Sequence, residues 1–216
     1  MSGRDPAQGT RRWAAIVLAA GSSTRMGRPK TRLEWKGSEL LTYQATSLRA
    51  AGATQVIVVV SVPDPPYVPD PAIAAPNSHP ERGKSESLRI GVAALEAWEA
   101  NDAGEDLARL EAVLICAVDQ PREPSLLHEL VAAHFENGHD ITIPMHTSGR
   151  AGHPIVVSHA LREELRTASE ETQGLRGIVR RDPSRVSHWL TDDESVLLDF
   201  NTPEEYERAR GRGPAT

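Results

Sequence analysis

The hydrophobic positions of the chain fall into continuous apolar runs separated by amphipathic stretches. Continuous runs are typical of strands buried on both faces, and they occupy residues 13–18, 55–60 and 112–118. Helical spacing of apolar residues predicts helices over 40–51, 85–99, 124–137 and 203–210. Shorter strands are expected over 141–144, 154–158 and 196–198. This alternation predicts an α/β fold with one Rossmann-like, doubly wound, mostly parallel sheet and helices on both of its faces.

Turn-forming residues agree with these boundaries. Gly52 and Gly138 follow two of the expected helices, and Pro124 stands in the first turn of another. Seven prolines between Pro63 and Pro80 argue against a helix or a central strand there. We therefore expect an irregular surface loop in that segment.

Length and composition narrow the class of protein. The 216 residues fit one domain, expected over 13–210, with a flexible tail at 1–12 and a short tail at 211–216. The formal net charge of −6 argues against a general nucleic-acid-binding surface. No window approaches the roughly 20 apolar residues of a membrane span. A single cysteine, Cys116, and no secretory signal favour a soluble protein of the reducing cytoplasm.

Two polar segments each follow an expected central strand directly. They are residues 21–30 and 119–121. In open sheets of this kind, ligands bind beyond the carboxyl ends of the strands. We therefore expect both segments to meet at one crevice.

The first of these segments has the chemistry that a triphosphate requires. Small residues let backbone N–H groups approach phosphate oxygens, and Ser22 and Ser23 can donate hydroxyl hydrogen bonds. Arg25 and Lys30 add positive charge, and no acidic residue intervenes. The alternative is an ordinary surface turn with solvated charges.

Two well-known glycine motifs are excluded at this loop. A P-loop would place its second glycine where Met26 stands. A dinucleotide fingerprint would place its second glycine where Ser23 stands, which counts against a doubly wound oxidoreductase.

The run LAAGSSTRMGRPK from Leu18 to Lys30 resembles the signature loop of the nucleotidyltransferases that act on the molybdenum cofactor. The resemblance continues through residues 83–88, Asp119-Gln120-Pro121, Gly152-His153-Pro154 and residues 199–205. It implies Arg25, Lys30 and Asp119 as catalytic residues. It implies nucleotide contacts by Leu18, Ala19, Ala20, Gly21, Ser22, Ser23, Arg25, Lys30 and Ser87.

The same resemblance implies a Mg²⁺ site. Asp119 follows a buried strand, where a carboxylate needs a counter-charge, and Mg²⁺ sites of this sort use about one or two protein ligands besides phosphate and water. The family usually has D-x-D-T-P-E-D where this chain has Asp199-Phe200-Asn201, so Asn201 replaces a carboxylate and Asp199 can share its role. The alternatives are helix N-caps, Asp119 before Pro124 and Asn201 before Pro203.

His153 resembles a family position near the acceptor substrate, and Arg176 could meet the acceptor's phosphate. The alternatives are a histidine that hydrogen-bonds within its loop and a solvated arginine. The family's basic residue before Gly152 is displaced here to Arg150, which makes a contact through Arg150 doubtful.

The implied reaction transfers a nucleoside monophosphate to an acceptor phosphate and releases pyrophosphate. An ionised phosphate is already a nucleophile, so positioning and charge stabilisation suffice for catalysis. Guanylyl-transferring members tend to have glycine at Ala20 and methionine at Gln120, and the forms found here resemble the cytidylyl-transferring members. We therefore expect CTP, rather than another nucleoside triphosphate, and a molybdopterin-type acceptor.

Two other functions stay open at this stage. One is cytidylyl transfer to a sugar or polyol phosphate, because related enzymes share much of the loop. The other is a non-catalytic, nucleotide-binding maturation chaperone whose partner is a client molybdoenzyme.

Overall fold

The computed structural model describes residues 11–21, 24–102 and 109–211. Ser22, Ser23 and most of the two expected tails lie outside these ranges. Among the residues described, no helix is both long enough and apolar enough to cross a membrane.

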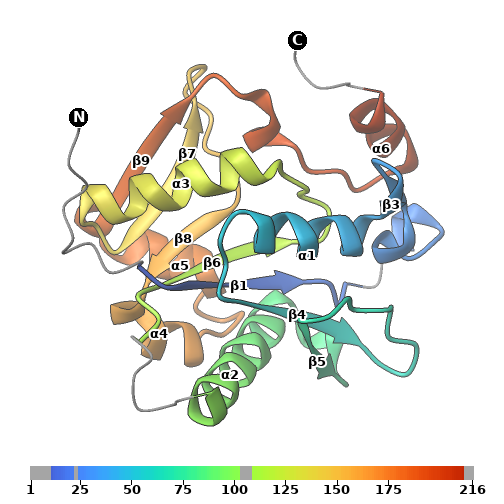
Figure 1. The fold of residues 1–216 in the computed structure, drawn as a ribbon, viewed down its shortest axis with the longest axis horizontal. Helices are drawn as coiled ribbons and strands as arrows, with labels where there is room; N and C mark the ends of the chain where they lie inside the picture. The colour runs from blue at the N-terminus through green and yellow to red at the C-terminus, as the bar shows by residue number, and fades with distance from the viewer. Residues whose placement is uncertain (1–10, 22–23, 103–108, 212–216) are drawn as a thin grey trace, which may run out of the picture.

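A seven-stranded sheet runs through the molecule in the order β5-β4-β1-β6-β8-β7-β9 (Figure 1). Strand β8 pairs antiparallel with β6 and β7, and the other pairings are parallel. The mostly parallel, doubly wound sheet predicted from the sequence is therefore confirmed. Its strands are β1 (Trp13–Leu18), β4 (Gln55–Ser61), β5 (Ile73–Asn77), β6 (Ala112–Ala117), β7 (Ile141–His146), β8 (Ile155–Ser158) and β9 (Val186–Thr191).

Helices cover both faces of this sheet (Figure 1). One face carries α1 (Leu40–Ala50) and α3 (Pro124–Asn137). The other carries α2 (Lys84–Asp102), α4 (Arg162–Arg166) and α5 (Gly174–Arg181). The last helix, α6 (Pro203–Arg210), lies beside a small hairpin of β2 (Glu34–Trp35) and β3 (Ser38–Glu39). Short 3₁₀ helices connect these elements: η1 (Thr24–Met26), η2 (Lys30–Arg32), η3 (Pro80–Arg82), η4 (His159–Leu161), η5 (Pro183–Arg185) and η6 (Glu194–Leu197).

Strand β1 lies between β4 and β6 and is buried on both faces, so its alternate side chains enter opposite cores. Ala15 and Val17 pack with α1 and α3, whereas Ala14 and Ile16 pack with α2. A Cβ on Gly91 of α2 would lie 2.5 Å from the Ile16 side chain, so α2 sits directly against β1. Side chains just past β1 are therefore held between two packed layers.

Two expectations from the sequence are wrong. The proline-rich segment is not wholly irregular, because β5 forms within it and contains Pro76. As an edge strand β5 pairs only with β4, so the missing N–H of a proline is tolerated. Residues 196–198 form no strand: η6 covers the start of that segment, and β9 is the strand that pairs with β7. The polar residues Ser187 and His188 interrupt the apolar pattern of β9, so the sequence did not predict this strand.

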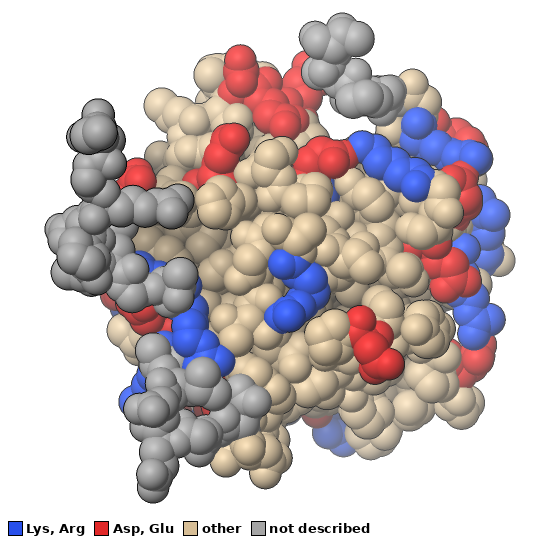
Figure 2. Space-filling view, viewed as in Figure 1, with Lys and Arg blue, Asp and Glu red and all other residues tan. Residues whose placement is uncertain are grey.

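On the face viewed in Figure 2, basic and acidic side chains are scattered among uncharged ones, and one basic side chain lies near the centre. This face shows no continuous basic surface among the described residues.

Candidate functional site

The two polar segments that follow β1 and β6 meet at the carboxyl end of the sheet. Lys30 Nζ donates a hydrogen bond to Asp119 Oδ2 at 2.5 Å, and both side chains are largely buried. They line a cavity of about 330 Å³, here called the central cavity. Its walls also include Leu18, Ala20, Gly21, Arg25, Gly83, Lys84, Ser87 and Asn201. The expected single crevice is thus present.

Two glutamine side chains hold the start of the loop that carries Asp119. The side chain of Gln120 accepts from the Ala117 N–H at 3.1 Å, and Gln44 Nε2 donates to the Ala117 carbonyl at 2.9 Å. Asp119 is only 8% exposed, and its Oδ1 is a buried atom with no hydrogen-bond partner among the described residues. Glu123, not Asp119, occupies the N-cap position of α3, so the N-cap interpretation of Asp119 is wrong.

Asn201 reaches the same point from the far end of the chain. Its Oδ1 accepts from Lys30 Nζ at 3.0 Å, and its Nδ2 donates to Asp199 Oδ1 at 3.1 Å. The N-cap of α6 is Thr202, which forms a capping box with Glu205. The N-cap interpretation of Asn201 is therefore also wrong, and its amide is directed at Lys30 and Asp199.

An aromatic cluster explains how residues 30 and 201 come together. Phe200 stacks on Trp35 of the β2–β3 hairpin at 5.7 Å between ring centroids, and Tyr206 packs on both rings. Tyr206 also donates its hydroxyl hydrogen bond to the Glu34 carbonyl at 2.5 Å. These contacts hold the hairpin that follows Lys30 against the segment that carries Asn201.

The oxygen atoms around Lys30 suit a hard divalent cation. Asp119 Oδ1, Asp119 Oδ2 and Asn201 Oδ1 are a carboxylate and an amide donor set, which is the chemistry that Mg²⁺ prefers. Burial and the charge of Asp119 raise the pKa of Asp199. The described residues hold no group of three or more His, Cys, Asp or Glu arranged for a metal. The set therefore fits a cation that shares its coordination with a bound phosphate.

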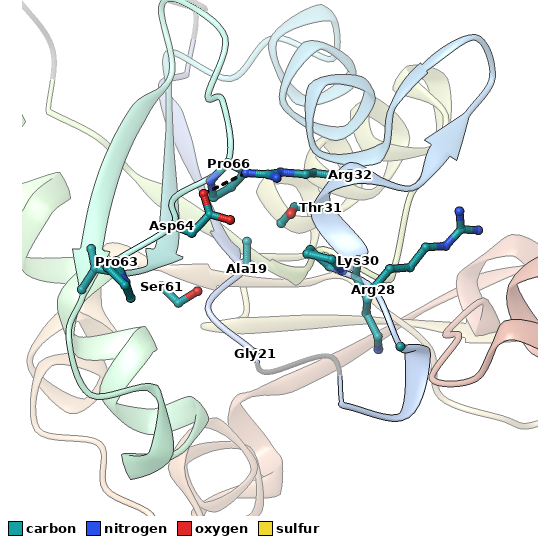
Figure 3. A pocket seen from close by; sticks show the side chains of 13 residues that line it. Ala19, Gly21, Arg28, Lys30, Thr31, Arg32, Ser61, Pro63, Asp64 and Pro66 are labelled. Carbon is teal, nitrogen blue, oxygen red and sulfur yellow. Dashed lines mark hydrogen bonds and ion pairs between the residues drawn. The ribbon is translucent and has the colours of Figure 1, made fainter.

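The glycine-rich loop divides its residues between two hollows. Ala20 and Arg25 line the central cavity, whereas Ala19 lines a second hollow of about 480 Å³ between η2 and the end of β4. Figure 3 shows this second hollow, with Arg32 and Asp64 directed toward each other from its opposite walls. Their ion pair measures 3.0 Å from Nη2 to Oδ1. Gly21 and Lys30 line both spaces, so the hollows adjoin.

Ser87 lies in α2 and contributes its side chain to the central cavity. Asn77, at the end of β5, is fully buried and donates to Ser87 Oγ from its Nδ2 at 3.0 Å. Sequence reasoning missed Asn77 because it assigned that segment to an irregular loop. A signal was present, since a polar residue at the end of a strand in this fold points toward the ligand edge.

His153 and Arg176 meet in a third space of about 430 Å³, here called the lateral cavity. Its apolar wall includes Leu18, Leu88, Ile115 and Leu175, and its polar wall adds Lys84, Gln120 and Gln173. Desolvation, with the positive charges of Arg122 and Lys84, lowers the pKa of His153, so its imidazole is neutral at pH 7. Arg150 lines a different hollow, beside Asp199 and Arg208.

Lys84 was also missed from the sequence. It stands at the start of α2 and lines both the central and the lateral cavity, which share Leu18 and Ala117 as well. Two ligands bound in these cavities would therefore be neighbours, with a cationic side chain between them.

A family model described as "MobA-like NTP transferase domain" matches residues 15–186. The chain belongs to this family. The match includes the glycine-rich loop, Asp119, His153 and Arg176, and it ends before Asn201.

Relatives named in the same terms align over most of the chain. A molybdenum cofactor guanylyltransferase of Xanthomonas euvesicatoria pv. vesicatoria is 29% identical, over 94% of this chain and 97% of its own. One from Rhizobium johnstonii is 30% identical, over 89% of this chain and 88% of its own. The crystal structure of Rv0371c from Mycobacterium tuberculosis H37Rv has the same fold, with a TM-score of 0.74 at 22% identity, covering 94% of this chain and all of that one. The chain is therefore a nucleotidyltransferase by family, and it shares the fold of Rv0371c.

Proposed function

We propose that this protein transfers CMP from CTP, with Mg²⁺, to the phosphate of a molybdopterin-type acceptor and releases pyrophosphate. The contact of Lys30 Nζ with both Asp119 and Asn201 is the observation that carries the proposal. It places the cationic end of a triphosphate-binding loop against oxygen atoms that suit a divalent cation. The names of the relatives support the molybdenum cofactor as acceptor.

Each group has a role that follows from its position. Arg25, Lys30 and Lys84 neutralise the triphosphate in the central cavity. Asp119 and Asn201 would hold the metal, and Asp199 supports Asn201 through its hydrogen bond. Bound Mg²⁺ would supply charge neutralisation at the phosphate oxygens.

The acceptor occupies the lateral cavity, beside neutral His153 and cationic Arg176. Its ionised phosphate attacks the α-phosphorus of CTP, the bond to the β-phosphate breaks, and pyrophosphate departs. Because the nucleophile is already ionised, catalysis requires positioning and charge stabilisation rather than a general base.

CTP is proposed although the relatives are named guanylyltransferases. The loop form with Ala20 and the Asp119-Gln120-Pro121 form support it, because they resemble the cytidylyl-transferring members. Ala20 lines the central cavity, where a glycine would leave more room for a larger base. A pyrimidine fits the narrower site.

Pyrophosphate release tests the proposal directly. We expect the purified chain to release pyrophosphate from CTP only when Mg²⁺ and molybdopterin are both present, with sugar and polyol phosphates as comparison acceptors. The Lys30→Ala variant should lose activity by about 10²-fold or more, because it removes the charge that meets the triphosphate. Pyrophosphate release with GTP but not with CTP would overturn the choice of base.

A maturation chaperone would behave differently in the same assay. It would bind CTP, and transfer cofactor to a client molybdoenzyme, without releasing pyrophosphate. Near-normal release by Lys30→Ala would contradict the assignment of the glycine-rich loop.

A further inference from the structure

Arg122 is a buried cation that sequence reasoning overlooked. It directly follows Asp119-Gln120-Pro121 and is only 3% exposed. Four of its five guanidinium N–H groups donate to backbone carbonyls at 2.9 to 3.0 Å. The acceptors are the carbonyl oxygens of Pro121, His153, Val196 and Leu198.

These carbonyls belong to the three loops that carry the candidate site. Pro121 ends the loop of Asp119, His153 lines the lateral cavity, and Leu198 directly precedes Asp199. The loops follow three different strands, β6, β7 and β9. A planar guanidinium can satisfy several carbonyls in fixed directions at once, whereas a lysine ammonium at the end of a flexible chain cannot.

The absence of a side chain at Gly152 lets its loop approach the Val196 carbonyl closely. A Cβ on Gly152 would lie 2.3 Å from the Val196 carbonyl oxygen, too close for any other residue type. That same oxygen accepts from Arg122 Nη2 at 3.0 Å and from the His153 N–H at 2.8 Å. Gly152 therefore permits the close approach that brings two of the loops onto Arg122.

We infer that Arg122 is a positioning residue that holds the Asp119, His153 and Asp199–Asn201 loops in one arrangement. Arg122 acts through backbone carbonyl groups. That these loops bind the metal and the acceptor rests on the proposed function. Weakening the hydrogen bonds of Arg122 should lower the affinity for the metal and for the acceptor together, since the same guanidinium holds the loops of both. The glycine-rich loop has no hydrogen bond to Arg122 among the described residues, so CTP binding should change least.

The test compares Arg122→Lys with a matched control, Arg162→Lys. Arg162 is similarly shielded, with a side chain 11% exposed, but it pairs with Glu99 between α4 and α2, away from the site. In Arg122→Lys we expect the Mg²⁺ concentration for half-maximal activity and the acceptor KM to rise about 10- to 100-fold. At a Mg²⁺ concentration that saturates each variant, the KM for CTP should stay within about twofold of wild type, because the glycine-rich loop keeps its contacts. Arg162→Lys should alter thermal stability alone.

Hydrogen–deuterium exchange without ligands gives a second readout, independent of activity. We expect faster exchange at the backbone N–H groups of residues 153 and 196–201 in Arg122→Lys, and unchanged exchange there in Arg162→Lys. Should Arg122→Lys fail to fold, Gly152→Ala displaces the Val196 carbonyl while keeping the arginine, and the same loops should exchange faster.

Unchanged exchange at residues 153 and 196–201, or a rise in the CTP KM at saturating Mg²⁺ equal to the rise in the acceptor KM, would overturn the inference. A wild-type chain that binds nucleotide without turnover would instead contradict the proposed function. The exchange comparison would still decide the role of Arg122 in that case.

Discussion

Asn77 Nδ2 donates a hydrogen bond to Ser87 Oγ at 3.0 Å, and this contact sets the direction of the serine hydroxyl. The orientation of the Asn77 amide is itself determined, because its Oδ1 accepts from the His79 backbone N–H at 2.8 Å. A backbone N–H can only donate, so Nδ2 must face Ser87. Oγ is then an acceptor toward Asn77, and its own hydrogen is left for the central cavity, which Ser87 lines.

The first prediction concerns Asn77→Asp, a variant in which Ser87 becomes the donor of this hydrogen bond. In Asn77→Asp the carboxylate keeps the His79 contact but accepts from Ser87, so the hydroxyl hydrogen turns away from the ligand. We expect CTP to bind about 2- to 10-fold more weakly at pH 8, where the carboxylate is ionised, and Ser87→Ala to weaken binding similarly. Isothermal titration with CTP and Mg²⁺ measures both variants.

The double variant distinguishes a relay from a general loss of stability. If Asn77 acts through Ser87, Asn77→Asp combined with Ser87→Ala should bind CTP no more weakly than Ser87→Ala alone. Additive losses would show that Asn77 supports the fold rather than the hydroxyl.

The second prediction concerns the amide at position 201. Asn201→Asp restores a second carboxylate beside Asp119, and ligand charge raises affinity for divalent cations. We expect the Mg²⁺ concentration for half-maximal activity to fall by about tenfold, while Asn201→Ala should raise it. Activity measured across a Mg²⁺ series after EDTA treatment gives both values. No change in either variant would remove Asn201 from the metal site.

The third prediction addresses the choice of base. Ala20→Gly removes a methyl group from a residue that lines the central cavity, so we expect kcat/KM for CTP relative to GTP to fall by about tenfold or more. Ala19→Gly is the matched control, because Ala19 is equally buried but lines the other hollow. Equal shifts in both variants would mean that loop flexibility, not cavity width, controls the base.

The fourth prediction is a pH dependence of stability at His134. This histidine is 4% exposed and contacts Thr142 Oγ1 through Nδ1 at 2.9 Å. Burial lowers its pKa from 6.5 to about 4, against the nearby charge of Asp140. Between these values the unfolded chain binds more protons than the folded chain, so stability falls as the pH is lowered through this window.

The expected contribution is a loss of about 2 kcal/mol in the free energy of unfolding between pH 7.5 and pH 5. Urea unfolding at the two pH values measures it. On acidification, the free energy of unfolding of His134→Gln should fall by about 2 kcal/mol less than that of wild type. His139 is an exposed histidine near the end of α3, so the free energy of unfolding of His139→Gln should fall as in wild type. Parallel pH dependence in wild type and His134→Gln would contradict the burial argument.

Much of the fold was predictable from local pattern. Continuous apolar runs identified β1, β4 and β6, because strands covered on both faces need apolar side chains at every position. Gly138, at φ +68°, ended α3 as expected. The rule that ligands bind beyond the carboxyl ends of parallel strands predicted that the segments of Lys30 and Asp119 lie together.

The sequence by itself thus determined the sheet, the glycine-rich loop and the segments that converge on it, since each depends on neighbouring residues or on a repeating pattern. Only the tertiary structure decided which polar side chains meet. Asn77 faces Ser87 because an edge strand formed among prolines, and Thr202 rather than Asn201 caps α6. Arg122 joins carbonyls up to 76 positions away, which no local spacing reveals. Hydrogen bonds between distant segments depend on three-dimensional packing, and packing is settled only when the whole core has formed.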